Sequence, residues 1–254
     1  MAGKRFSNIK RAVDTIGKGR IWLLAVIVAG YMIVYFTAHN SPIYIPTVAY
    51  PDEIDDVVIV LDAGHGGADG GCVSVNGVPE KGINLEILLR VKALCESAGY
   101  QVVTTRESDV SIHDKGVEGL RAQKESDMEN RLEIMNLYEN AVVVSIHQNQ
   151  FTDPKYSGAQ MFYTATNPDS QRLAQIMQEK FVSNLQPENK REIKLSGKEL
   201  YLIYFTKAPS VMVECGFLSN PEEASKLESE QYQSEVAFTI FSGIVEFLEE
   251  NKGE

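Results

Sequence analysis

Short runs of apolar, mostly β-branched residues alternate with amphipathic stretches along most of this chain. Such runs are typical of buried strands, and apolar side chains at helical spacing indicate helices that cover a sheet. Their alternation predicts an α/β protein with a mostly parallel sheet. Strands are expected at residues 57–61, 101–105, 141–146, 159–163, 201–204 and 211–214, and helices at 84–97, 126–138, 169–185 and 231–249.

A polar stretch at residues 107–125 interrupts this alternation. It contains Gly116 and Gly119, and we expect it to be a long loop. Loops of this length in compact domains often serve as lids or docking surfaces. A solvated excursion without consequence is the alternative.

The N-terminal part has a different composition. Residues 1–20 carry six Lys or Arg and one Asp, and residues 21–38 carry no charge. An apolar segment of eighteen residues is at the short end of what spans a bilayer, and the basic flank predicts a cytoplasmic N-terminus. We therefore expect a single-pass anchor in the cell membrane, with the following residues extracytoplasmic. A cleaved signal peptide is less favoured, because its best cleavage site would put the bulky Phe36 at position −3.

Residues 39–56 contain three of the nine prolines and are expected to be a short extended linker. The remaining residues, 57–254, are long enough for one domain with a sizeable core. The net charge of the chain is −11 despite its basic N-terminus, so residues 39–254 are strongly acidic. An acidic body is a poor candidate for binding nucleic acid, and no such partner is expected.

Four residues with ligand or acid–base side chains lie at or near the ends of predicted strands. His65 follows the first strand in a glycine-rich stretch, His147 follows the strand at 141–146, and Glu214 ends the strand at 211–214. Glu80 lies between the glycine-rich stretch and the first helix. Ligands of open α/β sheets collect at the carboxyl ends of strands.

Two histidines and two glutamates at one sheet edge would make a zinc site with three ligands, an open position for water, and an acid beside it. A carboxylate at the end of a buried strand is costly unless a cation or a reaction uses it. Each residue alone has a simpler interpretation, such as a structural histidine or a glutamate at a helix N-terminus. The glycine-rich stretch lacks the motifs of a phosphate-binding loop.

Four sequence blocks, LDAGHGGADGG, PEKGINLEI, SIHQN and VMVECGFLSNPEE, resemble in order and spacing the zinc-dependent N-acetylmuramoyl-L-alanine amidases of bacterial cell walls. The resemblance covers residues 57–254 and implies a twisted, mostly parallel sheet of about six strands flanked by helices. It implies that His65, Glu80 and His147 bind zinc and that Glu214 is the catalytic glutamate. The implied reaction is hydrolysis of the amide bond between N-acetylmuramic acid and L-alanine in peptidoglycan.

Within that family, the anchor, the lack of wall-binding repeats and the insertion at 107–125 are most similar to the sporulation amidases, which act in spore cortex muramic-lactam formation. The insertion is a candidate surface for an activating protein partner. The family usually has an acidic residue where this chain has Gly82. A catalytically silent relative that binds glycan or a partner, or a zinc peptidase or deacetylase, are the alternative functions.

Several further residues are candidates for supporting roles around the site. Asp62 and Asn149 are candidates to orient the ligands, with turn formation as an equally good alternative. The cysteines Cys72, Cys95 and Cys215 are expected to be small buried or loop residues, with a disulfide between the first and the last as the less favoured alternative. His39 and His113 are expected to be solvated.

Overall fold

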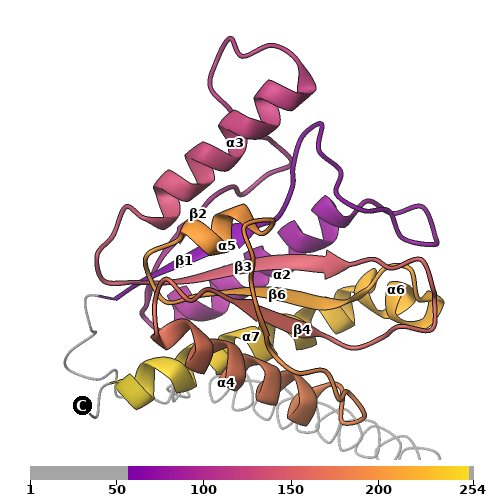
Figure 1. Ribbon diagram of the computed structural model, residues 1–254. Helices are drawn as coiled ribbons and strands as arrows, with labels where there is room; N and C mark the ends of the chain where they lie inside the picture. Colours follow the sequence, from indigo (N-terminus) through magenta and orange to yellow (C-terminus); the bar gives the residue numbers. More distant parts are fainter. Residues whose placement is uncertain (1–56, 252–254) are drawn as a thin grey trace, which may run out of the picture. The chain divides into compact units, whose positions relative to one another are not determined.

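A six-stranded sheet forms the centre of the part of the chain that the computed structural model describes, residues 57–251 (Figure 1). The strand order is β2-β1-β3-β6-β4-β5, and all pairs are parallel except β4 with β6. The predicted α/β class and mostly parallel sheet are therefore confirmed. The strands are β1 (Val58–Ala63), β2 (Gln101–Thr104), β3 (Ala141–Asn149), β4 (Gln160–Tyr163), β5 (Lys194–Leu195) and β6 (Ser210–Phe217).

Two apolar cores lie on the two faces of this sheet. In β1, Ile59 and Leu61 face the larger core, whereas Val58 and Val60 face the smaller one. Because successive side chains of a strand point to opposite faces, strands covered on both sides must be apolar throughout. The larger core packs against α2 (Glu80–Ser97), α4 (Asp169–Asn184) and α7 (Glu230–Asn251), and the smaller one against α3 (Leu120–Met135) and α5 (Tyr201–Phe205).

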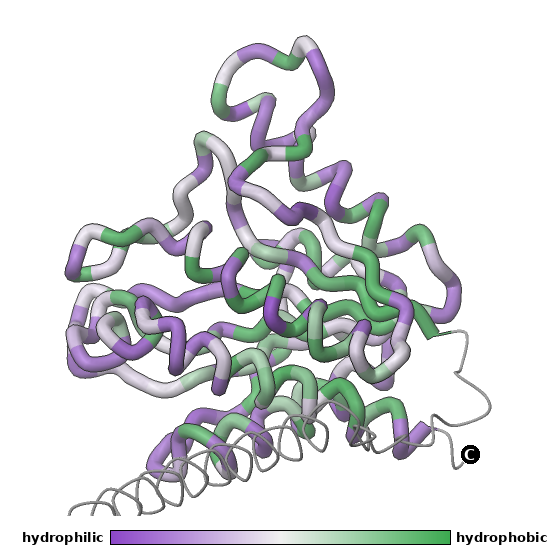
Figure 2. The backbone as a smooth tube through the Cα atoms, turned by 180° about the vertical axis from the view of Figure 1, so that it is seen from behind, coloured by the Kyte–Doolittle hydropathy of each residue, from purple (hydrophilic) through white to green (hydrophobic). Residues whose placement is uncertain are grey.

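The hydropathy of the chain follows these layers. In Figure 2 the strands in the middle are largely green, and the end of α3 that projects from the sheet is largely purple. Helix α3 has buried residues only along part of its length, including Arg131 and Met135. Its polar N-terminal half therefore contributes little to either core.

The strand expected at residues 201–204 is wrong, because this segment forms helix α5. A run of four or five apolar residues cannot be assigned to a strand or a helix from periodicity alone. Here Leu202 and Ile203 are buried on the sheet, while Phe205 is exposed. The sixth strand is instead β5, whose two residues, Lys194 and Leu195, are both exposed and too few to show a strand pattern in the sequence.

The loop expected at residues 107–125 is only partly correct, since α3 begins at Leu120. Helix α6 (Pro221–Leu227) was not predicted, although its start carries a clear signal. Asn220 caps the helix through its side-chain oxygen, Pro221 occupies the first turn, and two glutamates follow. Those features would have identified the helix from sequence.

The predicted N-terminal segments, 1–20, 21–38 and 39–56, lie outside the described residues, as does His39. Within residues 57–251, no helix combines the length and the apolar character needed to cross a membrane. The anchor at residues 21–38 therefore stays a prediction.

Candidate metal centre

The four predicted site residues come together at the carboxyl edge of the sheet. His65 lies two residues beyond β1, His147 lies near the end of β3, and Glu80 is the first residue of α2. Glu214 in β6 is the register partner of His147. Because neighbouring parallel strands end on the same side, residues more than sixty positions apart in sequence meet there.

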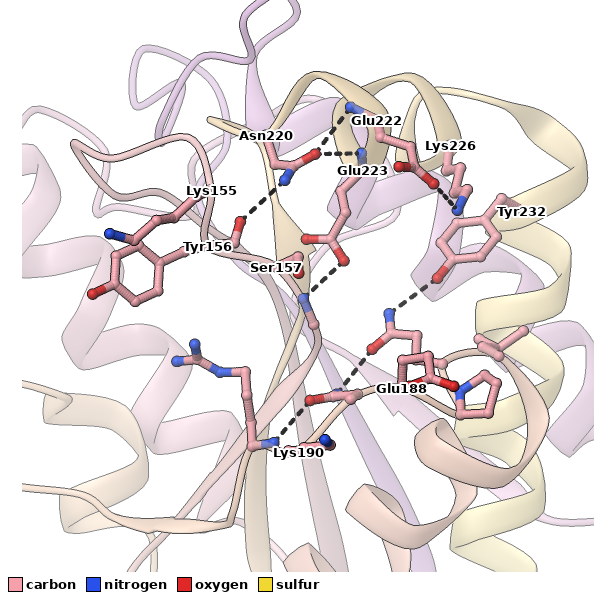
Figure 3. A pocket seen from close by; sticks show the side chains of 16 residues that line it. Lys155, Tyr156, Ser157, Glu188, Lys190, Asn220, Glu222, Glu223, Lys226 and Tyr232 are labelled. Carbon is pink, nitrogen blue, oxygen red and sulfur yellow. Dashed lines mark hydrogen bonds and ion pairs between the residues drawn. The ribbon is translucent and has the colours of Figure 1, made fainter.

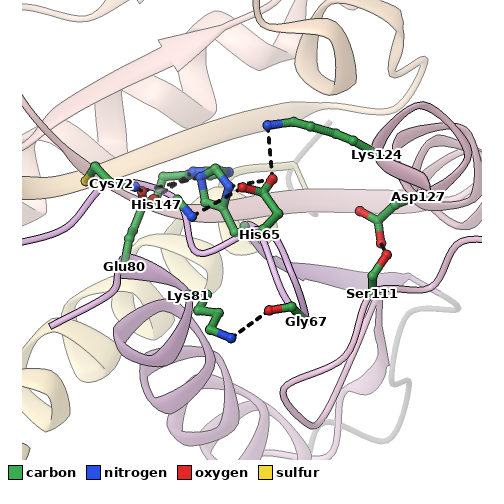
Figure 4. A network of polar contacts seen from close by, with 12 residues as sticks. His65, Gly67, Cys72, Glu80, Lys81, Ser111, Lys124, Asp127 and His147 are labelled. Atoms are coloured by element: carbon green, nitrogen blue, oxygen red, sulfur yellow. Dashed lines mark hydrogen bonds and ion pairs between the residues drawn. The ribbon is translucent and has the colours of Figure 1, made fainter. Parts of the chain in front are cut away.

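His65, Glu80 and His147 form a compact group of possible metal ligands (Figure 4). The Nε2 atom of His65 lies 3.3 Å from Glu80 Oε2, and Nδ1 of His147 lies 3.0 Å from Glu80 Oε1. One ligand atom from each residue lies within 4.8 Å of the other two. Two imidazole nitrogens and one carboxylate oxygen are a donor set that suits zinc with one position left open.

The glycine-rich stretch closes tightly around these ligands. A Cβ atom on Gly64 would lie 2.1 Å from Cε1 of His147, and one on Gly71 would lie 2.5 Å from Glu80 Oε2. His65 itself has a positive φ of 63°, a conformation that is uncommon outside glycine. Strained backbone of this kind persists where the surroundings hold it, often at functional sites.

Gly64→Ala is expected to displace the imidazole of His147. Metal affinity should then fall by at least about tenfold, because substitutions of residues that orient metal ligands have effects of this size. Gly82→Ala is the matched control, because a Cβ there would contact nothing within 4 Å. Metal content after dialysis against a graded zinc buffer measures both variants. Equal zinc affinity in the two would show that His147 does not need its present position.

A set of polar groups around the ligands fixes their orientation. Glu80 accepts hydrogen bonds from the backbone N–H of Cys72 and Gln148, both at 3.0 Å, and from Nδ2 of Asn84 at 3.1 Å. Asp69 Oδ2 lies 3.0 Å from Nδ1 of His65 and 3.0 Å from Nζ of Lys124. Contacts of this kind set the tautomer and orientation of metal ligands.

Asp69 determines which nitrogen of His65 is available. Burial raises the pKa of this carboxyl, but the hydrogen bond with His65 and that with Lys124 outweigh burial and lower it to about 2. An ionised carboxylate can only accept, so Nδ1 of His65 donates and Nε2 is left for the metal. Asp69 was not predicted, although its spacing of four residues from His65 in one loop was visible.

The two orienting residues that were predicted do not have this role. Asp62 is fully buried and accepts hydrogen bonds from Arg131, Thr105 and Ser145 instead. Among the bonds within residues 57–251, none joins the side chain of Asn149 to a ligand residue. The asparagine that does bind the site is Asn84, one helical turn beyond Glu80.

Glu80 carries the negative charge of the centre. Burial alone would raise its pKa, but hydrogen bonds with His147 and His65 hold it well below its usual range. Burial lowers the pKa of His147, while the hydrogen bond and charge of Glu80 raise it to about 8. Without metal, His147 therefore holds a proton at neutral pH.

Metal affinity is expected to fall as the pH decreases below about 8, by up to about tenfold per pH unit, because the metal must displace the proton of His147. Because the pKa of His147 is raised in the folded protein, acid protonates this residue and favours the metal-free form. Calorimetric titration in two buffers with different heats of ionisation should detect about one proton released per metal at neutral pH. A metal affinity that stays constant from about pH 6 to about pH 8 would contradict this expectation.

Glu214 lies beside the ligand group but is not part of it. Its Oε2 atom is buried and has no hydrogen-bond partner among the described residues. Burial raises the pKa of this carboxyl to about 7, against the opposing charge of His147. A carboxyl with a pKa near neutrality can both take up and release a proton.

The cysteines and His113 play no part in the ligand group. Cys72, Cys95 and Cys215 are free thiols, so the alternative of a disulfide between the first and the last is wrong. Their pKa values are raised by burial. His113 is half-buried and lies 2.9 Å from the Ser111 hydroxyl, which corrects the expectation that it is solvated.

The fold and the site together define a class: α/β proteins with a His-Glu-His group that could hold a metal ion, and with a glutamate beside it. Sequence comparison identifies the family within that class. The N-acetylmuramoyl-L-alanine amidase family matches residues 59–246, and the chain belongs to this family.

Individual relatives agree with this assignment. The germination-specific N-acetylmuramoyl-L-alanine amidase of Bacillus subtilis is 36% identical over 197 residues, which are 78% of this chain and 81% of that protein. The CwlD amidase from Clostridioides difficile, solved in complex with the GerS lipoprotein, is 39% identical with a TM-score of 0.73. That comparison covers 76% of this chain and 98% of the other. The amidase AmiC2 of Nostoc punctiforme is 29% identical with a TM-score of 0.64, over 76% of this chain and 97% of its own.

Proposed function

We propose that this protein is a zinc-dependent amidase that hydrolyses the bond between N-acetylmuramic acid and the first L-alanine of the stem peptide in peptidoglycan. The observation that carries the proposal is the placement of Glu214, whose buried Oε2 atom has no hydrogen-bond partner among the described residues, beside the His65–Glu80–His147 group. Membership of the amidase family supplies the substrate class.

The donor set and its surroundings fit zinc. Zinc held by these three residues would supply a Lewis acid that polarises the amide carbonyl and makes the attacking water more acidic. Glu80 provides the negative charge, and the backbone N–H groups of Cys72 and Gln148 hold its carboxylate in place. Asp69 accepts from Nδ1 of His65, which would leave Nε2 for the metal.

Glu214 would move the proton. As a carboxylate it accepts the proton of the attacking water, and as the acid it returns that proton to the departing L-alanine nitrogen. A pKa of about 7 makes both forms accessible near neutral pH. The Oε2 atom makes no hydrogen bond within residues 57–251, so it is available to the reacting molecule.

The proposed substrate is testable on the full-length protein in detergent, with purified peptidoglycan as substrate. When zinc is present, mass spectrometry should find two products: peptides with a new N-terminal L-alanine, and muramic acid that carries no peptide. Neither product should form after zinc is removed by a chelator. New ends within the peptide, or loss of acetyl groups, would instead support a zinc peptidase or deacetylase. Binding without cleavage would support a catalytically silent relative.

We also propose a membrane location and a role in spore cortex formation or germination. The anchor predicted at residues 21–38 would place the catalytic domain outside the cytoplasm, and the named function of the B. subtilis relative supports the developmental role. A reporter fused after Glu254 should be active outside the cytoplasm. Recovery of a soluble form that begins near His39 would favour a cleaved signal peptide.

The segment from residue 107 to the start of α3 is our proposed surface for an activating protein partner or for control of access. Asp109 accepts hydrogen bonds from the backbone N–H of Gly67 at 2.9 Å and from Lys81 at 2.7 Å. Lys124 in α3 contacts Asp69, which in turn holds His65. The CwlD relative was solved with a lipoprotein partner, which supports the search for one. If a shortened segment left turnover, zinc affinity and partner dependence unchanged, the proposal would fail.

A further inference from the structure

A second cavity of about 720 Å³ lies apart from the metal centre (Figure 3). It is bounded by residues 155–158, by the segment 185–191 that follows α4, and by α6. None of the four proposed site residues lines it. Its volume falls in the range of cavities that bind small molecules or short peptide segments.

Arg191 lines this cavity and is held on two sides. Its Nη2 donates a hydrogen bond to Oε1 of Gln160, and its guanidinium lies 4.9 Å from the centre of the Phe217 ring. No carboxylate forms an ion pair with Arg191 among the described residues. Arg106 is the only other arginine within residues 57–251 that lacks an ion pair with a carboxylate. Its donors are used by backbone carbonyls instead.

The other charged groups around the cavity are largely satisfied by the protein. Lys226 pairs with Glu222 at 2.7 Å, and Lys155 pairs with Asp153 at 2.7 Å. Glu223 accepts the backbone N–H groups of Gly158 and Phe217 at 2.9 and 2.7 Å. The guanidinium of Arg191 is therefore a fixed cation with unused donors, and its Nε is buried without a partner.

Arg191 is also linked, through Gln160, to the strand that carries the proposed catalytic base. Its partner Gln160 in β4 is the register partner of Glu214 in β6, so the two side chains stand on the same face of adjacent strands. The positive charge of Arg191 acts to lower the pKa of Glu214. Arg191 thus connects the cavity that it lines with the strand pair that carries Glu214.

We propose that Arg191 binds a carboxylate of the stem peptide and that the cavity holds the peptide released by hydrolysis. The inference rests on the proposed function, because it assigns a subsite to that reaction. A guanidinium presents a planar set of donors that matches a carboxylate, and a cation already fixed by Gln160 and Phe217 loses little freedom on binding. The cavity lining carries four cations (Lys155, Lys190, Arg191 and Lys226) against three carboxylates (Glu188, Glu222 and Glu223). Its formal charge is therefore only +1, which a single carboxylate balances better than a phosphate.

The test compares two soluble muropeptides that differ in one group. Both carry N-acetylmuramic acid and L-alanine, and the next peptide residue has either its free carboxylate or the corresponding carboxamide. The full-length zinc-loaded enzyme should show a kcat/KM about 10- to 100-fold higher for the carboxylate, as expected for a charge-assisted hydrogen bond, with the difference mainly in KM. The ratio between the two substrates cancels any general effect on Glu214.

Arg191→Gln should bring this ratio close to one, and Arg191→Lys should retain part of it. Lys190→Gln is the matched control, because it removes the same charge from an exposed neighbour in the same cavity and should keep the ratio. Equal kcat/KM for the two substrates in the unaltered enzyme would overturn the inference, as would an unchanged ratio in Arg191→Gln. Failure to cleave either substrate at the muramoyl–alanine bond would instead overturn the proposed function.

Discussion

Glu214→Gln is expected to lower turnover of peptidoglycan fragments by about 10²–10⁴ while the fold and most of the bound zinc are retained. Glutamine has nearly the same volume and can still hydrogen-bond a water molecule, but it cannot accept a proton at neutral pH. The carboxyl of Glu214 makes no hydrogen bond through Oε2 within residues 57–251, so the substitution breaks no contact of that atom. The zinc content and the rate of hydrolysis should be measured on the same preparation and compared with those of the unaltered protein.

Glu80→Gln is the comparison that separates a ligand from a base. A neutral amide is a poor replacement for a carboxylate ligand, and even partners outside the ligand group affect affinity by about 10- to 100-fold. This variant should therefore lose zinc affinity, and its activity should partly recover in excess zinc. Activity of Glu214→Gln should not recover. A Glu214→Gln protein that loses its zinc, or one that is loaded and hydrolyses normally, would reverse the two assignments.

The sequence was most informative where burial and chemistry conflict. His65, His147 and Glu214 each stand at or just beyond a strand that is otherwise apolar, and such polar residues at a sheet edge indicate function. Their meeting follows from the parallel pairing of β1, β3 and β6, which the α/β alternation predicts. Strand order and the antiparallel β4 could not be predicted, because they depend on contacts between distant segments.

Residues that orient the site were harder to predict because their signal lies in three dimensions. Asp62 lies one residue before the end of β1 and looks like a ligand partner, yet its carboxylate pairs with Arg131, 69 positions away. Asn84 and Asp69 have local spacings that fit their roles, but these spacings are common in helices and loops. The α5 segment was misassigned because five apolar residues fit a strand as well as a helix turn.

Arg131 connects the core to the metal centre. Its side chain is 2% exposed and pairs with Asp62 Oδ1 and Asp127 Oδ2, both at 2.7 Å. It also donates to the backbone carbonyls of Ala63 and His65 at 2.7 Å each. One cation thus neutralises a fully buried carboxylate and fixes the backbone that carries a ligand.

Arg131→Met is expected to lower the free energy of unfolding by about 3–5 kcal/mol, because it leaves the charge of Asp62 buried without its cation. Arg121→Met is the matched control on the same helix. The side chain of Arg121 is 93% exposed, so its ion pair with Glu125 should contribute less than about 1 kcal/mol to the free energy of unfolding. Urea unfolding of chelator-treated protein measures both variants without a contribution from metal binding. A loss below about 1 kcal/mol in Arg131→Met would contradict this account.

The pH dependence of the same variant gives a second, independent check. In the unaltered protein, burial raises the pKa of Asp62, but Arg131 and the hydroxyl hydrogen bonds lower it below its usual value. The ion pair therefore stabilises the protein at neutral pH, and this contribution is lost as the pH falls through that lowered pKa. In Arg131→Met the burial remains without the cation, so the pKa of Asp62 should rise and protonation should favour the folded state. The stability difference between the two proteins should accordingly narrow from about pH 7 to about pH 4, whereas a constant difference would mean that Asp62 is not the group left unpaired.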